Sequence, residues 1–114
     1  MIELETLNVE QGVSYTNDNE DLYKRILVDF YNDYKDALNQ LQHLSENDIE
    51  NCHILAHSLK GLTAILGSEV LPPLFYGIEM AAKEKSADLK SRIDSVSEPF
   101  SALLNELEDK GFSK

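Results

Sequence analysis

The hydrophobic positions along this chain recur at intervals of three and four residues, which is the spacing of one side of an α-helix. The clearest stretch reaches from residue 17 to about Ser45, and the polar run 17–19 at its start offers capping side chains. Its apolar stripe consists of Tyr23, Ile26, Leu27, Phe30, Tyr34, Ala37, Leu38, Leu41 and Leu44. The pattern predicts one long helix that buries this stripe.

A second helix is predicted from Asn47, where Glu50 follows three residues later in a capping-box-like arrangement. Its apolar positions continue to Leu66. Gly67 comes next and predicts the C-terminal stop, because glycine readily adopts the left-handed conformation that ends many helices.

Two more helices are predicted in the second half of the chain. The third begins within residues 68–72 and fades near Lys85, with Pro72 and Pro73 in a first turn, where a missing N–H donor costs little. The fourth starts at Ser86. Pro99 lies inside its apolar stripe, which predicts a kink rather than two separate helices.

Four amphipathic helices joined by short connections predict an all-α fold, an antiparallel four-helix bundle. Residues 4–15 are expected to add a short N-terminal helix across one end. At 114 residues the chain fits one domain with one core. We divide it into an N-terminal segment at 1–16, the bundle at about 17–109 and a tail at 110–114.

Charge and composition narrow the classes of function. The formal net charge is −11, from 10 Lys and Arg against 21 Asp and Glu, so a basic patch for nucleic acid or for an anionic membrane is not expected. The single Cys52 cannot form an internal disulfide. No apolar run is long enough to span a bilayer, and residues 1–10 lack the positive charge of a signal peptide. We therefore expect a cytoplasmic protein that contacts neither nucleic acid nor membrane.

The second helix carries the candidate chemistry. At roughly 100° of rotation per residue, its predicted core face gathers Cys52, Leu55, Leu59, Leu62 and Leu66. His57 lies nearly opposite, so the periodicity argues against a buried structural histidine. A second interpretation, an exposed histidine without a function, would hold if His57 stood alone.

His57 has two informative neighbours on its own helix. Lys60, three residues on, is within side-chain reach and carries a cation that can partly neutralise a phosphoryl group. Gly61, four residues on, costs about 0.5–1 kcal/mol relative to alanine inside a helix. It would clear space for another protein to approach His57, and a close helix–helix contact is the alternative reason for it.

These residues resemble the histidine phosphotransfer (HPt) domains of two-component phosphorelays. The segment 56–61 reads Ala-His-Ser-Leu-Lys-Gly and is similar to the family pattern A-H-x-L-K-G, followed six residues after its glycine by Gly67. The resemblance extends from about residue 4 to residue 85. In the third predicted helix it includes Leu71, Leu74, Ile78, Glu79 and Ala82. The chain departs from the family at Ser68, at Pro72 and Pro73, and at Gly77, all away from the phosphoacceptor position.

The resemblance implies a phosphocarrier rather than an enzyme. His57 would be the phosphoacceptor, Lys60 would neutralise phosphoryl charge, and Gly61 would give the partner clearance. The partners would be receiver domains of a hybrid sensor kinase or of a response regulator, which would supply Mg²⁺ themselves, so the chain needs no cofactor or metal of its own. No phosphate-binding loop is present in the sequence, so neither ATP binding nor autophosphorylation is expected. A monomer is expected.

Partner docking is expected around His57, on Glu50, His53, Ile54, Ala64 and Ile65. The two isoleucines lie at the border between core and solvent. Partly exposed apolar residues beside a reactive group suit transient protein binding, and contact with a neighbouring bundle helix is the alternative.

Two other functions stay open. His53 and His57 have the i, i+4 spacing of H-E-x-x-H zinc sites, but Ile54 replaces the catalytic glutamate, which leaves only a metal-binding bundle as an alternative. The other alternative is a degenerate HPt domain, a helical adaptor that docks receiver domains without accepting phosphate.

Overall fold

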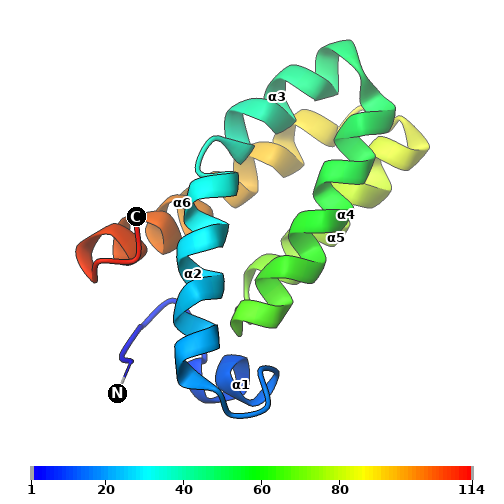
Figure 1. The fold of residues 1–114 in the computed structure, drawn as a ribbon. Helices are drawn as coiled ribbons and strands as arrows, with labels where there is room; N and C mark the ends of the chain where they lie inside the picture. The colour runs from blue at the N-terminus through cyan, green and yellow to red at the C-terminus, as the bar shows by residue number, and fades with distance from the viewer. Residues whose placement is uncertain (1, 114) are drawn as a thin grey trace.

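The computed structural model describes residues 2–113, and within them every regular element is an α-helix, which confirms the all-α class. Residues 1 and 114 of the predicted N-terminal segment and tail lie outside the described part. The helices pack against one another as a bundle around one core (Figure 1). Their bounds are α1 Val9–Ser14, α2 Glu20–Tyr34, α3 Ala37–Asn47, α4 Ile49–Leu66, α5 Leu71–Glu84 and α6 Leu89–Asp109.

The prediction of one long helix from residue 17 to Ser45 is wrong in one respect. Helix α2 ends at Tyr34, the backbone leaves helical geometry at Asp36, and α3 takes a direction different from that of α2 (Figure 1). The apolar stripe nevertheless continues through both helices: Tyr23, Leu27, Phe30, Ala37 and Leu41 are all buried. The spacing of the stripe is preserved across the break, so periodicity alone does not reveal it.

The ends of α4 are set by local hydrogen bonds. The N-cap is Asp48, whose carboxylate accepts a hydrogen bond from the N–H of Asn51, so the predicted start at Asn47 is one residue early. Asn47 instead closes α3, where its amide donates to the carbonyl of His43. At the other end Gly67 has φ +99°, the left-handed conformation that the sequence predicts.

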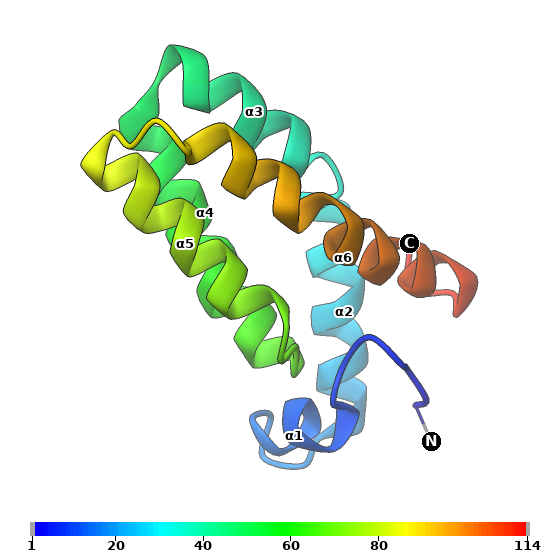
Figure 2. The ribbon, with the colours of Figure 1, turned by 180° about the vertical axis from the view of Figure 1, so that it is seen from behind.

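Helices α4 and α5 run antiparallel side by side, joined by the short connection 67–70 (Figures 1 and 2). Both prolines of α5 stand in its first turn, as predicted. Gly77 leaves room for the side chain of Arg92 on α6, because a Cβ at Gly77 would lie 2.9 Å from the guanidinium Nη1. Helix α5 spans Leu71–Glu84, which agrees with the third predicted helix, expected to begin within residues 68–72 and to fade near Lys85.

Helix α6 begins at Leu89, three residues after the predicted start at Ser86, and it continues through Pro99 as one helix rather than two, as the sequence predicts. Its buried residues are Leu89, Ile93, Val96, Phe100, Leu103 and Leu107. No helix in residues 2–113 combines the length and the apolar character needed to cross a membrane.

The N-terminal helix α1 is shorter than the predicted range 4–15, and the residues before it form a non-helical strap across α6. The carboxylate of Glu106 accepts hydrogen bonds from the N–H of Glu5 at 2.6 Å, and from the N–H and hydroxyl of Thr6 at 2.9 and 2.5 Å. The strap then joins the end of α4, where the N–H of Asn8 donates to the carbonyl of Gly67 at 2.8 Å. These contacts fix α1 across one end of the bundle.

Candidate functional site

The side of α4 that faces the core differs from the predicted one. Cys52, Leu59 and Leu66 are buried as expected. Leu55 and Leu62 are only half-buried, whereas Ala56 and Thr63 are fully buried in their place. The reason is that α5 packs along one flank of α4, which extends the buried surface toward that flank. The hydroxyl of Thr63 tolerates burial because it donates to the carbonyl of Leu59 at 2.7 Å.

His57 still lies outside the core: 63% of its side chain is exposed. Gly61, one turn further along α4, is also exposed, and a Cβ placed there would meet nothing within 4 Å. The alternative explanation of Gly61, a close helix–helix contact, is therefore wrong. The surface beside His57 is open on this side.

Glu79 of α5 contacts the His57 ring. Its Oε2 atom lies 2.9 Å from Nδ1 of His57, and its side chain is only 10% exposed. Burial on its own raises the pKa of the Glu79 carboxyl, but hydrogen bonds and charge from Lys60 and His57 lower it, and the net pKa is below its ordinary value. Glu79 is thus an ionised carboxylate at neutral pH.

The charge of Glu79 determines which ring nitrogen of His57 holds the proton. An ionised carboxylate only accepts hydrogen bonds, so the 2.9 Å contact requires the proton on Nδ1. In the neutral ring the lone pair is then on Nε2, the other nitrogen. A carboxylate behind one nitrogen orients the ring and makes the second nitrogen more basic, as in the histidine sites of many proteins.

Lys60 contacts the same carboxylate. Its Nζ atom lies 2.8 Å from Oε1 of Glu79, and 30% of its side chain is exposed. The two groups form a close ion pair between neighbouring helices. Lys60 therefore lies beside His57, as its spacing on the helix predicts, and is held there by the neighbouring helix.

His53 is the third side chain of α4 that turns toward Glu79, with Nε2 3.7 Å from Oε2. Its side chain is 32% exposed, less than the sequence suggests for a docking residue. Within residues 2–113 no three His, Cys, Asp or Glu side chains are arranged to hold a metal ion. The two histidines whose spacing suggested a metal site both lie close to the Glu79 carboxylate.

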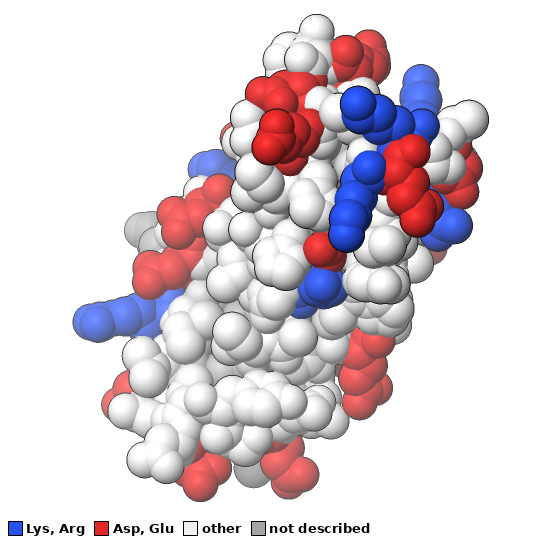
Figure 3. Space-filling model, turned by 90° about the vertical axis from the view of Figure 1, so that its right-hand side faces the viewer, with Lys and Arg blue, Asp and Glu red and all other residues white. Residues whose placement is uncertain are grey.

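The other predicted docking residues lie on the surface of α4. Glu50 and Ala64 are exposed, and Ile54 and Ile65 are 52% and 44% exposed. Figure 3 shows the side of the molecule formed by α4 and α5. Charged side chains gather at its upper end, the centre of the face below them is largely free of charge, and acidic side chains reappear at its lower edge. The sequence agrees, since residues 61–68 and 70–78 contain no Lys, Arg, Asp or Glu.

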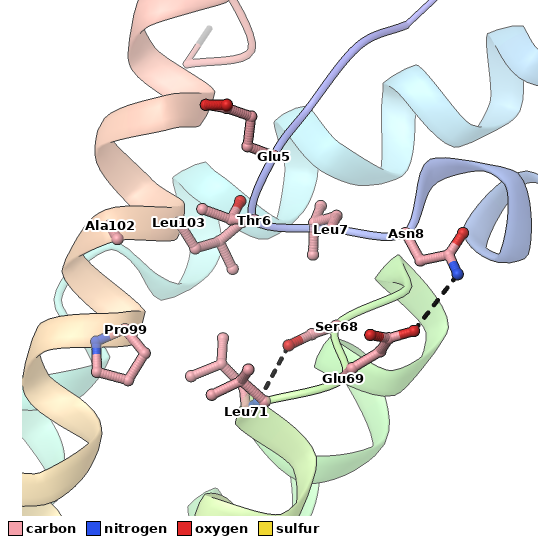
Figure 4. Close-up of a pocket in the computed structure, with 11 residues that line it drawn as sticks. Glu5, Thr6, Leu7, Asn8, Ser68, Glu69, Leu71, Pro99, Ala102 and Leu103 are labelled. Atoms are coloured by element: carbon pink, nitrogen blue, oxygen red, sulfur yellow. Dashed lines mark hydrogen bonds between the residues drawn. The ribbon is translucent and has the colours of Figure 1, made fainter.

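A separate hollow of about 340 Å³ lies between the N-terminal strap, the 67–70 connection and α6 (Figure 4). Polar groups at its rim are already paired: Asn8 donates to Glu69, and the hydroxyl of Ser68 accepts from the N–H of Leu71. His57 does not line this hollow. The candidate chemistry is therefore on the open face of α4 and not in a pocket.

The sequence analysis missed the role of Glu79. It noted this residue only as part of the spacing of the third predicted helix. The sequence does contain a sign of it, because Glu79 is a charged residue among the apolar positions of that helix. It stands next to Ile78 and one turn before Ala82, and both of these residues are buried in the structure. A buried carboxylate needs partners, and Lys60 and His57 of α4 supply them.

Comparisons with known protein families, with characterised proteins and with solved structures found no match for this chain. The assignment of function therefore depends on the residues and on their geometry.

Proposed function

We propose that this protein is a histidine phosphotransfer carrier that accepts a phosphoryl group on Nε2 of His57. The observation that carries the proposal is the contact between Nδ1 of His57 and the buried Glu79 carboxylate. It makes an exposed histidine into an oriented nucleophile, with its proton on the inner nitrogen and its lone pair toward solvent. The motif resemblance at residues 56–61 supports the same assignment.

The proposed donor is the aspartyl phosphate of a receiver domain. Nε2 of His57 attacks phosphorus, the P–N bond forms, and the P–O bond to the donor aspartate breaks, releasing a carboxylate. No proton moves in this step, because Nδ1 keeps its hydrogen and Nε2 has none. The ring gains positive character as the bond forms, and the Glu79 carboxylate at 2.9 Å stabilises that charge.

Lys60 would assist by neutralising charge on the phosphoryl oxygens, which is the main requirement of phosphoryl transfer. A receiver domain brings its own Mg²⁺ for the same purpose, so this chain needs no cofactor. The reverse reaction passes the group to the aspartate of a second receiver. The proposed partners are thus the receiver domains of a hybrid sensor kinase or of a response regulator, and the chain has no ATP-dependent activity of its own.

Docking is proposed on the open face around His57. The open space at Gly61 allows the active site of a receiver to approach, and the uncharged stretch 61–68 of α4, with its exposed Ile65, suits contact with an apolar helix surface. Glu50 and His53 would tune the choice of receiver at the charged end. In this proposal the carrier works in the cytoplasm as a monomer.

The proposal is tested by mixing the protein with ³²P-labelled receiver domains and scoring label that is stable to alkali and labile to acid. Label is expected on the wild type and on His43→Gln, whose exposed histidine lies on α3, and is expected to be absent from His57→Gln. Label that persists in His57→Gln contradicts the proposal. Receiver binding without label on any histidine would favour the adaptor function instead.

A further inference from the structure

Tyr76 of α5 lies beside Lys60, and the ammonium Nζ is 5.1 Å from the centroid of the Tyr76 ring. This distance is within the range of a cation–π interaction. Tyr76 is 51% exposed, so core packing does not explain an aromatic residue at this position. A large, partly exposed ring thus lies against Lys60 on the surface.

Glu79 and Tyr76 hold the same ammonium from the same side of α5. They are three residues apart in one helix, so their side chains share a face. The carboxylate contacts Nζ at 2.8 Å and the ring contacts it at 5.1 Å. Lysine is otherwise a flexible residue, and confining its side chain costs conformational entropy.

The two contacts have different consequences for the charge of Lys60. A carboxylate holds the ammonium but also cancels much of its field. A neutral aromatic ring holds it without adding a negative charge. The ring can therefore keep Lys60 near His57 while leaving the cation available to phosphoryl oxygens.

We propose that Tyr76 is a positioning residue that holds the Lys60 ammonium beside His57 for phosphoryl transfer. This inference rests on the proposed function of His57 and adds a residue that the sequence motif does not contain. Tyr76 acts only through Lys60, and it does not touch the reacting atoms.

The test uses a small donor, phosphoramidate, so that docking of a partner plays no part. Nε2 of His57 attacks phosphorus, the P–N bond of the donor breaks, and ammonia leaves with a proton from solvent. Tyr76→Phe keeps the aromatic ring and should react at the wild-type rate. Tyr76→Leu keeps an apolar side chain without the ring and should react about 2- to 5-fold more slowly, the size of an exposed cation–π contact.

Two further measurements separate positioning from a merely structural role. In a Lys60→Ala background the change from Tyr76 to Leu should have no further effect on the rate. In the unphosphorylated protein, NMR should find the ε-methylene protons of Lys60 shifted upfield by the ring in the wild type and in Tyr76→Phe. In Tyr76→Leu they should return to their free-chain position.

The outcomes are distinguishable. An equal slowing by Tyr76→Leu in the presence and absence of Lys60, or unchanged Lys60 proton shifts in Tyr76→Leu, overturns the role of Tyr76 while the labelling of His57 stands. Failure of the wild type to accept phosphate on His57 from phosphoramidate and from every receiver overturns the proposed function, and the role of Tyr76 with it.

Discussion

Nδ1 of His57 on α4 lies 2.9 Å from Oε2 of Glu79 on α5, and this contact joins an exposed ring to a buried carboxylate. It fixes the ring between two helices that form the most closely associated pair in the bundle.

The neutral His57 ring should carry its proton on Nδ1, because the Glu79 carboxylate accepts from that atom. In Glu79→Ala the acceptor is lost, and the population should shift toward the Nε2–H form. Long-range ¹H–¹⁵N spectra of histidine-labelled protein above pH 8 measure the two forms directly. His43, which is on α3, is the internal control, and its spectrum should not change. An Nε2–H form that dominates in the wild type would disprove the orientation of the nucleophile.

Lys60→Ala should slow phosphoryl transfer without abolishing it and should raise the pKa of Glu79. Burial raises this pKa and the Lys60 ammonium opposes that effect, so the pKa rises when the ammonium is removed. A ¹³C titration of the Glu79 carboxyl measures the shift. Lys90→Ala, an exposed change on α6, should leave the Glu79 titration unaltered. If the Glu79 pKa is the same with and without Lys60, the ion pair does not form in solution.

Alanine substitutions at two glycines should have opposite effects on stability. At Gly12 a Cβ would lie 2.4 Å from Cε1 of Tyr23 and 2.6 Å from the carbonyl of Leu66, so Gly12→Ala should cost about 1–3 kcal/mol in the free energy of unfolding. At Gly61 the Cβ meets open space, and Gly61→Ala should gain about 0.5–1 kcal/mol from helix propensity. Urea denaturation of both variants tests the pair. A destabilised Gly61→Ala would show that the open face is occupied.

A larger side chain at Gly61 tests clearance separately from chemistry. Gly61→Gln should react with phosphoramidate at close to the wild-type rate but accept phosphate from a receiver at least tenfold more slowly, about 1.4 kcal/mol of lost transition-state binding. The difference arises because only the receiver needs the space beside His57. Equal rates of receiver transfer in Gly61→Gln and wild type would remove the reason for glycine at this position.

The N-terminal strap should contribute a pH-dependent part of the stability through Glu106. Burial raises the pKa of Glu106, but hydrogen bonds from Glu5 and Thr6 lower it below its ordinary value. A carboxyl whose folded-state pKa is depressed stabilises the fold above the unfolded value of about 4.3 and loses that contribution as pH falls through the folded value.

Glu106→Gln should therefore be less stable than wild type at pH 7, by roughly 1–3 kcal/mol, and the difference should shrink as pH falls below about 4.3. Urea denaturation between pH 7 and pH 3 measures it. Glu98→Gln, an exposed change on the same helix, is the control and should show no such dependence. A constant difference across this range would mean that the charge of Glu106 is not what holds the strap.

The parts of the fold that could be predicted are those that periodicity encodes. The stripes of α2, α3 and α6 are buried or half-buried against the core, and Gly67 ends α4 in the predicted conformation. The break at Asp36 could not be predicted, because α3 continues the spacing of α2 across it. The burial of Ala56 and Thr63 was also missed, since it depends on where α5 packs rather than on the pattern within α4.

In the candidate site too, the relations within one helix could be predicted, and those that depend on packing between helices could not. The positions of His57, Lys60 and Gly61 relative to one another follow from one helix, and the sequence predicts them. Glu79 and Tyr76 come from a second helix whose rotation about its own axis is a tertiary property. Their contacts with α4 therefore became visible only in the folded structure.

The central claim is that His57 carries a phosphoryl group on Nε2 while Nδ1 keeps its proton on Glu79. The most direct test is NMR of ¹⁵N-histidine-labelled protein loaded with phosphoramidate, in which ³¹P–¹⁵N coupling identifies the phosphorylated nitrogen. We predict coupling to Nε2 of His57 alone, with a protonated Nδ1. Coupling to His43, to His53 or to Nδ1 of His57 would contradict the claim.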